Sequence, residues 1–139
     1  MLHLTATDTD DLSILSMQMQ DAVIRFSDIK YLARERRFAL VANRFAWDAL
    51  PAKTRRRTGI TFNAVMAAKR SGPKDLAPGT ILSLLAVIFV ARDGLSGTVT
   101  LSFAGGHRFA LDVECIDVLL DDLGPAWSTE HTPGHGDGA

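Results

Sequence analysis

The chain has 139 residues, of which 47% are hydrophobic and 22% charged, and its formal net charge is −1. This length and composition are typical of a single globular domain, and the longest apolar run, Leu84 to Val90, is too short to span a membrane as a helix. A single cysteine excludes an internal disulfide, and Met1 to Thr5 has neither the cationic start nor the apolar core of a secretion signal. We therefore expect a cytoplasmic protein.

Positive charge is concentrated in one part of the chain. Between Arg25 and Lys74, thirteen basic and three acidic residues give a charge of +10, and the other two basic and thirteen acidic residues give −11. This segregation favours an anion-binding face. The alternative is that acidic segments of the same chain neutralise the basic window.

The first half of the chain predicts a strand, a helix and a basic hairpin. Leu2 to Ala6 alternates apolar and polar residues like a short strand. A helix capped by Asp8 or Thr9 follows, with an acidic first turn and apolar residues at spacings of three and four up to about Val23. Two alternating segments on either side of Arg34–Arg37 then predict a hairpin with a basic tip.

The middle of the chain predicts a connection and a further strand. Trp47 to Thr54 is interrupted by Pro51 and is expected to be a connection. Gly59 to Lys69 alternates like a single strand. Leu82 to Ala91 is apolar on both faces, which favours a central strand.

The last part of the chain predicts a hairpin, a second helix and a tail. Gly97–Phe103 and His107–Val113 alternate on either side of a glycine-containing turn. Apolar residues from about Glu114 to Leu123 then recur at helical spacing and stop at Gly124-Pro125. This helix would present an acidic outer face made of Glu114, Asp117, Asp121 and Asp122.

Together these elements predict an α+β fold. We expect an antiparallel curled sheet or partly closed barrel of about six strands, with an N-terminal and a C-terminal helix, and a pleckstrin-homology-like shape is one form of it. We expect residues 1–127 to form a single α+β domain and residues 128–139 to form a flexible Gly/Pro/His tail.

Arginines are the strongest candidates for a binding site, because their planar fork binds two oxygens of an anion at once. The candidates form two clusters: the tip cluster, Arg34, Arg36 and Arg37, and the second cluster, Lys53, Arg55, Arg56 and Arg57. If the hairpin tip and the connection lie close together, the two clusters form one positive face. Phe38, Phe45 and Trp47 would offer bases a stacking surface, although Phe38 follows the strand period and is better read as core.

Other chemistry-bearing residues have a structural interpretation that is stronger than a functional one. Cys115 continues an apolar strand end and is best read as a buried, inert thiol. His107 lies at a hairpin turn without a partner for a triad. His131 and His135 are separated by proline and glycine in the tail. We assign no catalytic residue, no metal and no cofactor.

Several segments of the chain resemble a domain-of-unknown-function family of small alphaproteobacterial proteins. The matching segments are Gln20–Val23, Arg34–Phe45, Arg55–Gly59, Val113–Ile116 and Asp122–Trp127. The resemblance covers most of the chain up to Trp127. It implies a bacterial, cytosolic, single-domain protein and transfers no activity, cofactor or catalytic residue.

Three functional hypotheses remain open from the sequence. The first is a non-enzymatic binding or adaptor domain that contacts an acidic protein or a polyanion through the arginine-rich hairpin. The second is a small enzyme with a pocket inside the curled sheet that uses His107 or Cys115. The third is a self-associating protein, for example a homodimer, in which an acidic helix of one copy docks on the basic face of another.

Overall fold

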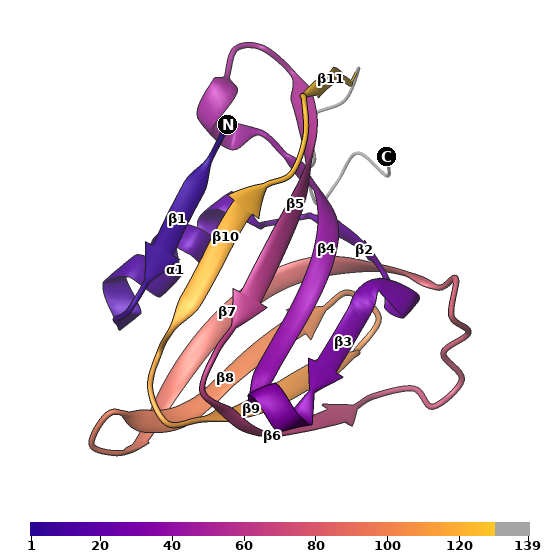
Figure 1. Cartoon of the computed structure of the whole chain (residues 1–139). Coiled ribbons are helices and arrows are strands. Elements are labelled where there is room, and N and C mark those ends of the chain that lie inside the picture. The colour runs from indigo at the N-terminus through magenta and orange to yellow at the C-terminus, as the bar shows by residue number, and fades with distance from the viewer. Residues whose placement is uncertain (130–139) are drawn as a thin grey trace.

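The computed structural model describes residues 1–129, which form eleven strands and one α-helix. The strands pair antiparallel in the order β1-β10-β5-β4-β2-β7-β8-β9-β6, with β3 beside β4 and β11 beside β5. The sheet curls into two layers and does not close: β1, β10, β5, β4 and β3 lie in front, and β7, β8, β9 and β6 lie behind (Figure 1). The helix α1 contacts both β1 and β7. The bounds are β1 His3–Ala6, α1 Thr9–Gln18, β2 Val23–Arg25, β3 Ile29–Leu32, β4 Arg37–Phe45, β5 Thr54–Phe62, β6 Val65–Ser71, β7 Ile81–Asp93, β8 Ser96–Phe103, β9 Arg108–Val113, β10 Val118–Asp122 and β11 Trp127–Ser128.

The predicted N-terminal helix is present but shorter than expected: it ends at Gln18, and Val23 begins strand β2. Asp8 is its N-cap, and its side chain accepts a hydrogen bond from the Asp11 backbone N–H at 2.8 Å. This bond satisfies one of the N–H groups that have no partner within the helix. Leu12 and Leu15 are buried and attach the helix to the sheet. Within residues 1–129, no helix is long and apolar enough to cross a membrane.

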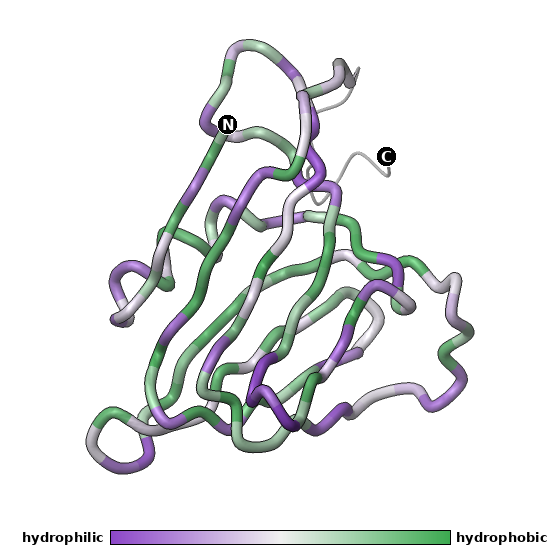
Figure 2. The backbone as a smooth tube through the Cα atoms, viewed as in Figure 1, coloured by the Kyte–Doolittle hydropathy of each residue, from purple (hydrophilic) through white to green (hydrophobic). Residues whose placement is uncertain are grey.

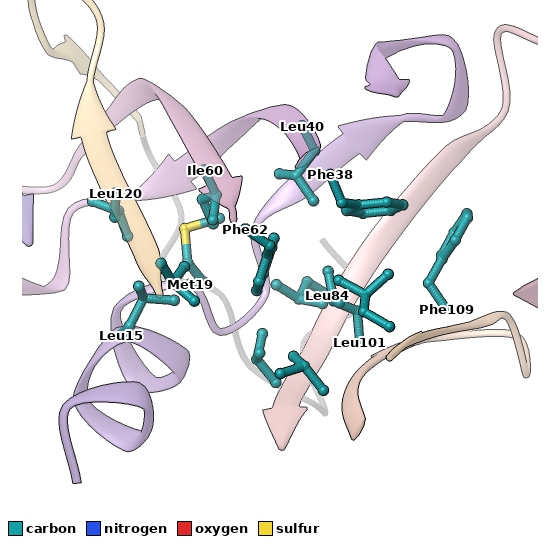
Figure 3. Close-up of a cluster of buried hydrophobic side chains, with 14 of the residues drawn as sticks. Leu15, Met19, Phe38, Leu40, Ile60, Phe62, Leu84, Leu101, Phe109 and Leu120 are labelled. Atoms are coloured by element: carbon teal, nitrogen blue, oxygen red, sulfur yellow. The ribbon is translucent and has the colours of Figure 1, made fainter. Parts of the chain in front are cut away.

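The apolar core fills the space between the two layers of the sheet. Phe38 from the front layer contacts Phe109 from the back layer, with ring centroids 5.6 Å apart. Leu15 and Met19 complete the core from the helix side (Figure 3). The concave side of the sheet is therefore a packed interior.

The predicted C-terminal helix is wrong, because Val118–Asp122 is strand β10. It pairs with β1 on one side and β5 on the other, and Val118, Leu120 and Asp122 point inward and are buried. The apolar residues fit both a helical and a strand period, and pairing with two strands far away in the sequence decides for the strand. The plug on which the pleckstrin-homology comparison depended is therefore absent.

The prediction of about six strands is also wrong, for local reasons. The single strand expected over Gly59–Lys69 bends at Ala64, whose φ is +55°, and becomes β5 and β6. The connection expected over Trp47–Thr54 ends where β5 begins, so Arg55–Arg57 belong to a strand. The hairpin β8–β9 is confirmed, and Gly105 and Gly106 supply the positive φ angles of its turn.

The strand over Leu82–Ala91 is confirmed as part of β7, which lies between β2 and β8. Its outer face is nevertheless open, since Ile88 and Val90 are 55% and 64% exposed. The position within the sheet is central, but burial on both faces is not observed. Residues 130–139, most of the predicted flexible tail, lie outside the described part of the chain.

Candidate functional site

The structure separates the two basic clusters that the sequence analysis joined. The tip cluster lies at the β3–β4 turn, and the second cluster lies at the start of β5. Because β4 and β5 pair from Phe38↔Phe62 to Arg44↔Arg56, the clusters are at opposite ends of this ladder, about 20 Å apart. Figure 1 shows the turn and the start of β5 at opposite ends of the front layer, and Figure 2 shows the turn as hydrophilic. The two clusters do not form one compact patch.

A buried ion pair lies at the end of the core nearest the second cluster. Arg44 on β4 and Asp122 on β10 both have side chains that are 0% exposed. The guanidinium is bidentate: Nε donates to Oδ1 at 2.9 Å and Nη2 donates to Oδ2 at 2.7 Å. Arg44 Nη1 also donates to Asp48 in the loop before β5, at 3.0 Å. A bidentate geometry and a further hydrogen bond to the remaining donor offset the cost of burying the two charges.

Further donors converge on the same carboxylate. The Thr58 hydroxyl donates to Oδ1 of Asp122 at 2.7 Å, and the Leu2 backbone N–H donates to Oδ2 at 2.6 Å. Arg56, on the inward side of β5, places Nε 3.7 Å from Oδ2. Asp122 thereby connects the N-terminal segment with β4 and β5.

In both members of this pair, the hydrogen bonds to the charged form outweigh the effect of burial on the pKa. Burial alone would raise the pKa of Asp122, but the hydrogen bonds from Arg44, Leu2 and Thr58 hold it below its usual value. Burial alone would lower the pKa of Arg44, but its bonds to Asp122 and Asp48 raise it. Both groups therefore remain charged inside the fold.

The outer face of the front layer carries the other basic residues of this region. Since Phe38, Leu40, Ala42 and Arg44 point into the core, the alternate residues of β4 point outward. The same alternation turns five basic side chains outward on β2, β3, β4 and β5. They are Arg25, Lys30, Arg37, Arg55 and Arg57, and we call them the basic strip.

The register of the strands sets the length of the basic strip. Lys30 is opposite Ala39, Arg57 is opposite Asn43, and Arg55 is opposite Phe45. From Arg37 to the level of Phe45 the strip follows eight residue steps of β4, about 27 Å. It is therefore a long, narrow row of cations.

Among residues 1–129, none of the five basic-strip side chains has a carboxylate within 4.0 Å. Arg37 bonds to the Asn63 amide oxygen and Arg55 to the Asn43 backbone oxygen, both neutral acceptors. Partial burial lowers the pKa of Arg55, and the more distant Asp21 only partly opposes this effect. The strip holds positive charge that neighbouring acids do not pair.

The remaining predicted binding residues lie outside the basic strip. Arg36 pairs with Glu114 at 3.1 Å, and Arg34 is exposed at the β3–β4 turn. Lys53 is exposed just before β5, and Arg56 is turned inward toward Asp122. Of the seven predicted residues, the basic strip includes Arg37, Arg55 and Arg57.

The residues considered for catalysis do not share a site. His107 precedes β9 and Cys115 follows it, so eight residue steps, or about 27 Å of extended chain, separate them. Cys115 lines an open groove of about 530 Å³ beside Leu95 and Thr7. The apolar core occupies the interior of the curled sheet, and the hypothesis of a small enzyme that uses His107 or Cys115 stays a prediction. Of the three rings considered for stacking, Phe38 and Phe45 are buried, whereas Trp47 is partly exposed and donates its indole N–H to the Gln20 backbone oxygen at 3.2 Å.

Sequence reasoning missed Arg44, Arg25 and Lys30. For Arg44 a signal was present: it continues the buried series Phe38, Leu40, Ala42 at every second residue. A charged residue in phase with a core face is expected only where it has a partner. The partner, Asp122, lies 78 residues further along the chain, and no local pattern identifies it.

The comparisons with known proteins identify a family. A family model described as a protein of unknown function (DUF2948) matches residues 2–135. No curated protein and no solved structure matches the chain.

Proposed function

The chain belongs to the DUF2948 family, and we propose that it is a non-enzymatic binding domain whose basic strip holds an extended acidic segment of a partner protein. The observation that carries this proposal is the row of five outward basic side chains without a carboxylate within salt-bridge distance among the described residues. Such a row attracts anions and raises the rate of encounter with an acidic partner.

The spacing of the strip supports an extended peptide as the partner. Arg55 and Arg57 are two residues apart on β5, about 6.8 Å along the strand. An extended peptide presents every second side chain on one face at the same interval. Glutamate or aspartate at alternate positions therefore matches the strip.

The surface also favours a protein over a nucleic acid. Unpaired bases need exposed aromatic rings for stacking. On β4 the two rings, Phe38 and Phe45, are buried, and the outward residues are Ala39, Val41 and Asn43. The exposed ring of Trp127 on β11 is opposite Arg55, so stacking on it would be confined to one end of the strip. The strip supplies charge and hydrogen bonds, which acidic side chains use.

The test measures binding of a labelled peptide with alternating glutamates by fluorescence anisotropy. We expect affinity to fall steeply with salt, because exposed charges are screened. Arg25→Ala with Arg57→Ala should lower affinity about tenfold or more, since hydrogen bonds to charged groups contribute about 1.5–3 kcal/mol each.

The matched control is Lys74→Ala with Arg108→Ala, which removes the same charge from exposed positions outside the strip. This control should retain most of the affinity. Equal losses in the two double variants would mean that only net charge matters, and the proposal would then be wrong.

A further inference from the structure

One point of the basic strip is hollowed. β4 pairs with β2 at Asn43 and with β3 at residues 37–40, and the 3₁₀ turn Phe26–Asp28 joins these two neighbours. A pocket of about 170 Å³ opens at this fork, lined by Val23, Arg25, Asp28, Val41, Ala42, Asn43, Arg57 and Ile81. The Ala42 side chain lies in the core, so its backbone forms part of the floor.

The polar groups of the pocket come from three adjacent strands. Arg57 on β5 is directly opposite Asn43 on β4, and Asn43 is opposite Val23 on β2. Arg25 follows Val23 by two residues and points to the same side. Arg57 and Arg25 therefore line the pocket from the two strands that flank β4 at Asn43, with Arg25 as the last residue of β2.

This arrangement fits a phosphate group better than a carboxylate. A guanidinium donates two parallel N–H bonds to an anion, so Arg25 and Arg57 address oxygens on opposite sides of a ligand. A tetrahedral phosphate presents three acceptor oxygens in different directions, whereas a carboxylate presents two in one plane. The volume equals that of about six water molecules, enough for a phosphate but not for a nucleoside as well.

Asp28 lines the same pocket and brings a negative charge to it. With Arg25 and Arg57 it leaves the pocket a net charge of +1, and no described carboxylate lies within 4.0 Å of either guanidinium. Its carboxylate repels a free phosphate dianion. It also offers an acceptor to a ligand that has an N–H group beside its phosphate, as a peptide backbone does.

We propose that this pocket receives a phosphorylated side chain of the acidic segment, held by Arg25, Asn43 and Arg57, with Asp28 accepting a backbone N–H of the same segment. The inference depends on the proposed function, since it assigns a recognition point within the same strip. Phosphorylation of the partner would then strengthen binding without a change in this protein.

The experiment compares three probes by titration calorimetry: an acidic peptide with one phosphoserine, the same peptide with glutamate at that position, and inorganic phosphate. The phosphopeptide should bind about tenfold more tightly than the glutamate peptide, as expected for additional charge-assisted hydrogen bonds. Arg57→Lys keeps the charge and removes the fork, so it should weaken binding of the phosphopeptide more than binding of the glutamate peptide and thereby abolish this preference. Lys74→Arg is the matched control and should leave the preference intact.

Asp28→Ala separates the two sources of phosphate. It should strengthen binding of inorganic phosphate severalfold, by removing a repulsive charge, and it should not strengthen binding of the phosphopeptide, which also loses the acceptor of its backbone N–H. Inorganic phosphate that binds wild type as tightly as the phosphopeptide would overturn the peptide assignment.

Equal, salt-sensitive affinity for the two peptides would overturn the pocket and leave the proposed function standing. If neither peptide binds, both ideas fail.

Discussion

Arg44 and Arg57 lie on neighbouring strands, about one strand spacing apart, yet they differ in burial and in their contacts with carboxylates. Arg44 is fully buried and is bound by two carboxylates. Arg57, beside it on the next strand, points outward with no carboxylate within 4.0 Å among residues 1–129. The two-residue period of a strand sorts the arginines of β4 and β5 into an inner group that is paired with carboxylates and an outer group that points away from the core.

The same sorting modifies the interpretation of the overall charge. Part of the excess positive charge between Arg25 and Lys74 is neutralised by acids of the same chain, through the contacts of Arg44 and Arg56 with Asp122 and of Arg36 with Glu114. The five residues of the basic strip have no carboxylate within 4.0 Å among residues 1–129. Internal neutralisation therefore applies to the first group of residues, and an anion-binding face on the basic strip stays a prediction.

Among the substitutions around the buried Arg44, Asp122→Asn should have the largest effect on the free energy of unfolding. It leaves the buried guanidinium of Arg44 without its bidentate partner, which should lower the free energy of unfolding by about 3–5 kcal/mol. Urea denaturation followed by circular dichroism measures the loss. Asp75→Asn, in an exposed loop, is the control and should change stability by less than about 0.5 kcal/mol.

Acid should reproduce part of this loss. Because the folded-state pKa of Asp122 lies below its unfolded value, the stabilisation is complete above the unfolded pKa and is lost as the pH falls through the folded-state pKa. The Asp122→Asn variant lacks this component, so its stability should depend less on pH below the ordinary aspartate pKa of about 3.8. An identical acid dependence in the two proteins would contradict the role assigned to Asp122.

Thr58→Val should have a smaller effect of the same origin. The substitution keeps the shape of the side chain and removes the hydroxyl that donates to Asp122 at 2.7 Å, so about 1–2 kcal/mol of stability should be lost. Thr61, on the same strand, points outward, and Thr61→Val should be close to neutral. Thermal denaturation of both variants tests the difference between the two faces. If both variants are equally destabilised, the inward and outward positions are not distinct in energy.

Local patterns predicted those parts of the fold whose stabilising contacts are also local. The helix over Thr9–Gln18 carries its own cap, and the hairpin β8–β9 carries its own turn glycines. The segment Val118–Asp122 was misread because its apolar residues fit two periods, and β1 and β5, which decide between them, are far away in the sequence.

The candidate site was predictable only in residue type. The clustering of arginines was visible in the sequence, but which of them point outward depends on where β5 begins and on the phase of its alternation. Reading Arg55–Arg57 as a connection concealed this phase, so Arg56 was grouped with Arg55 and Arg57. Arg25 joins the strip through the pairing of β2 with β4, which rests on the single register pair Val23↔Asn43.

The most direct test of the division between inner and outer arginines is a titration with the acidic peptide that follows the arginine Nε–Hε signals by NMR. The account predicts that the signals of Arg25, Arg55 and Arg57 shift progressively with peptide, and that the signal of Arg44 stays where it is. A shift of Arg44 comparable to that of Arg57, or no shift of any strip arginine at saturating peptide, would contradict it.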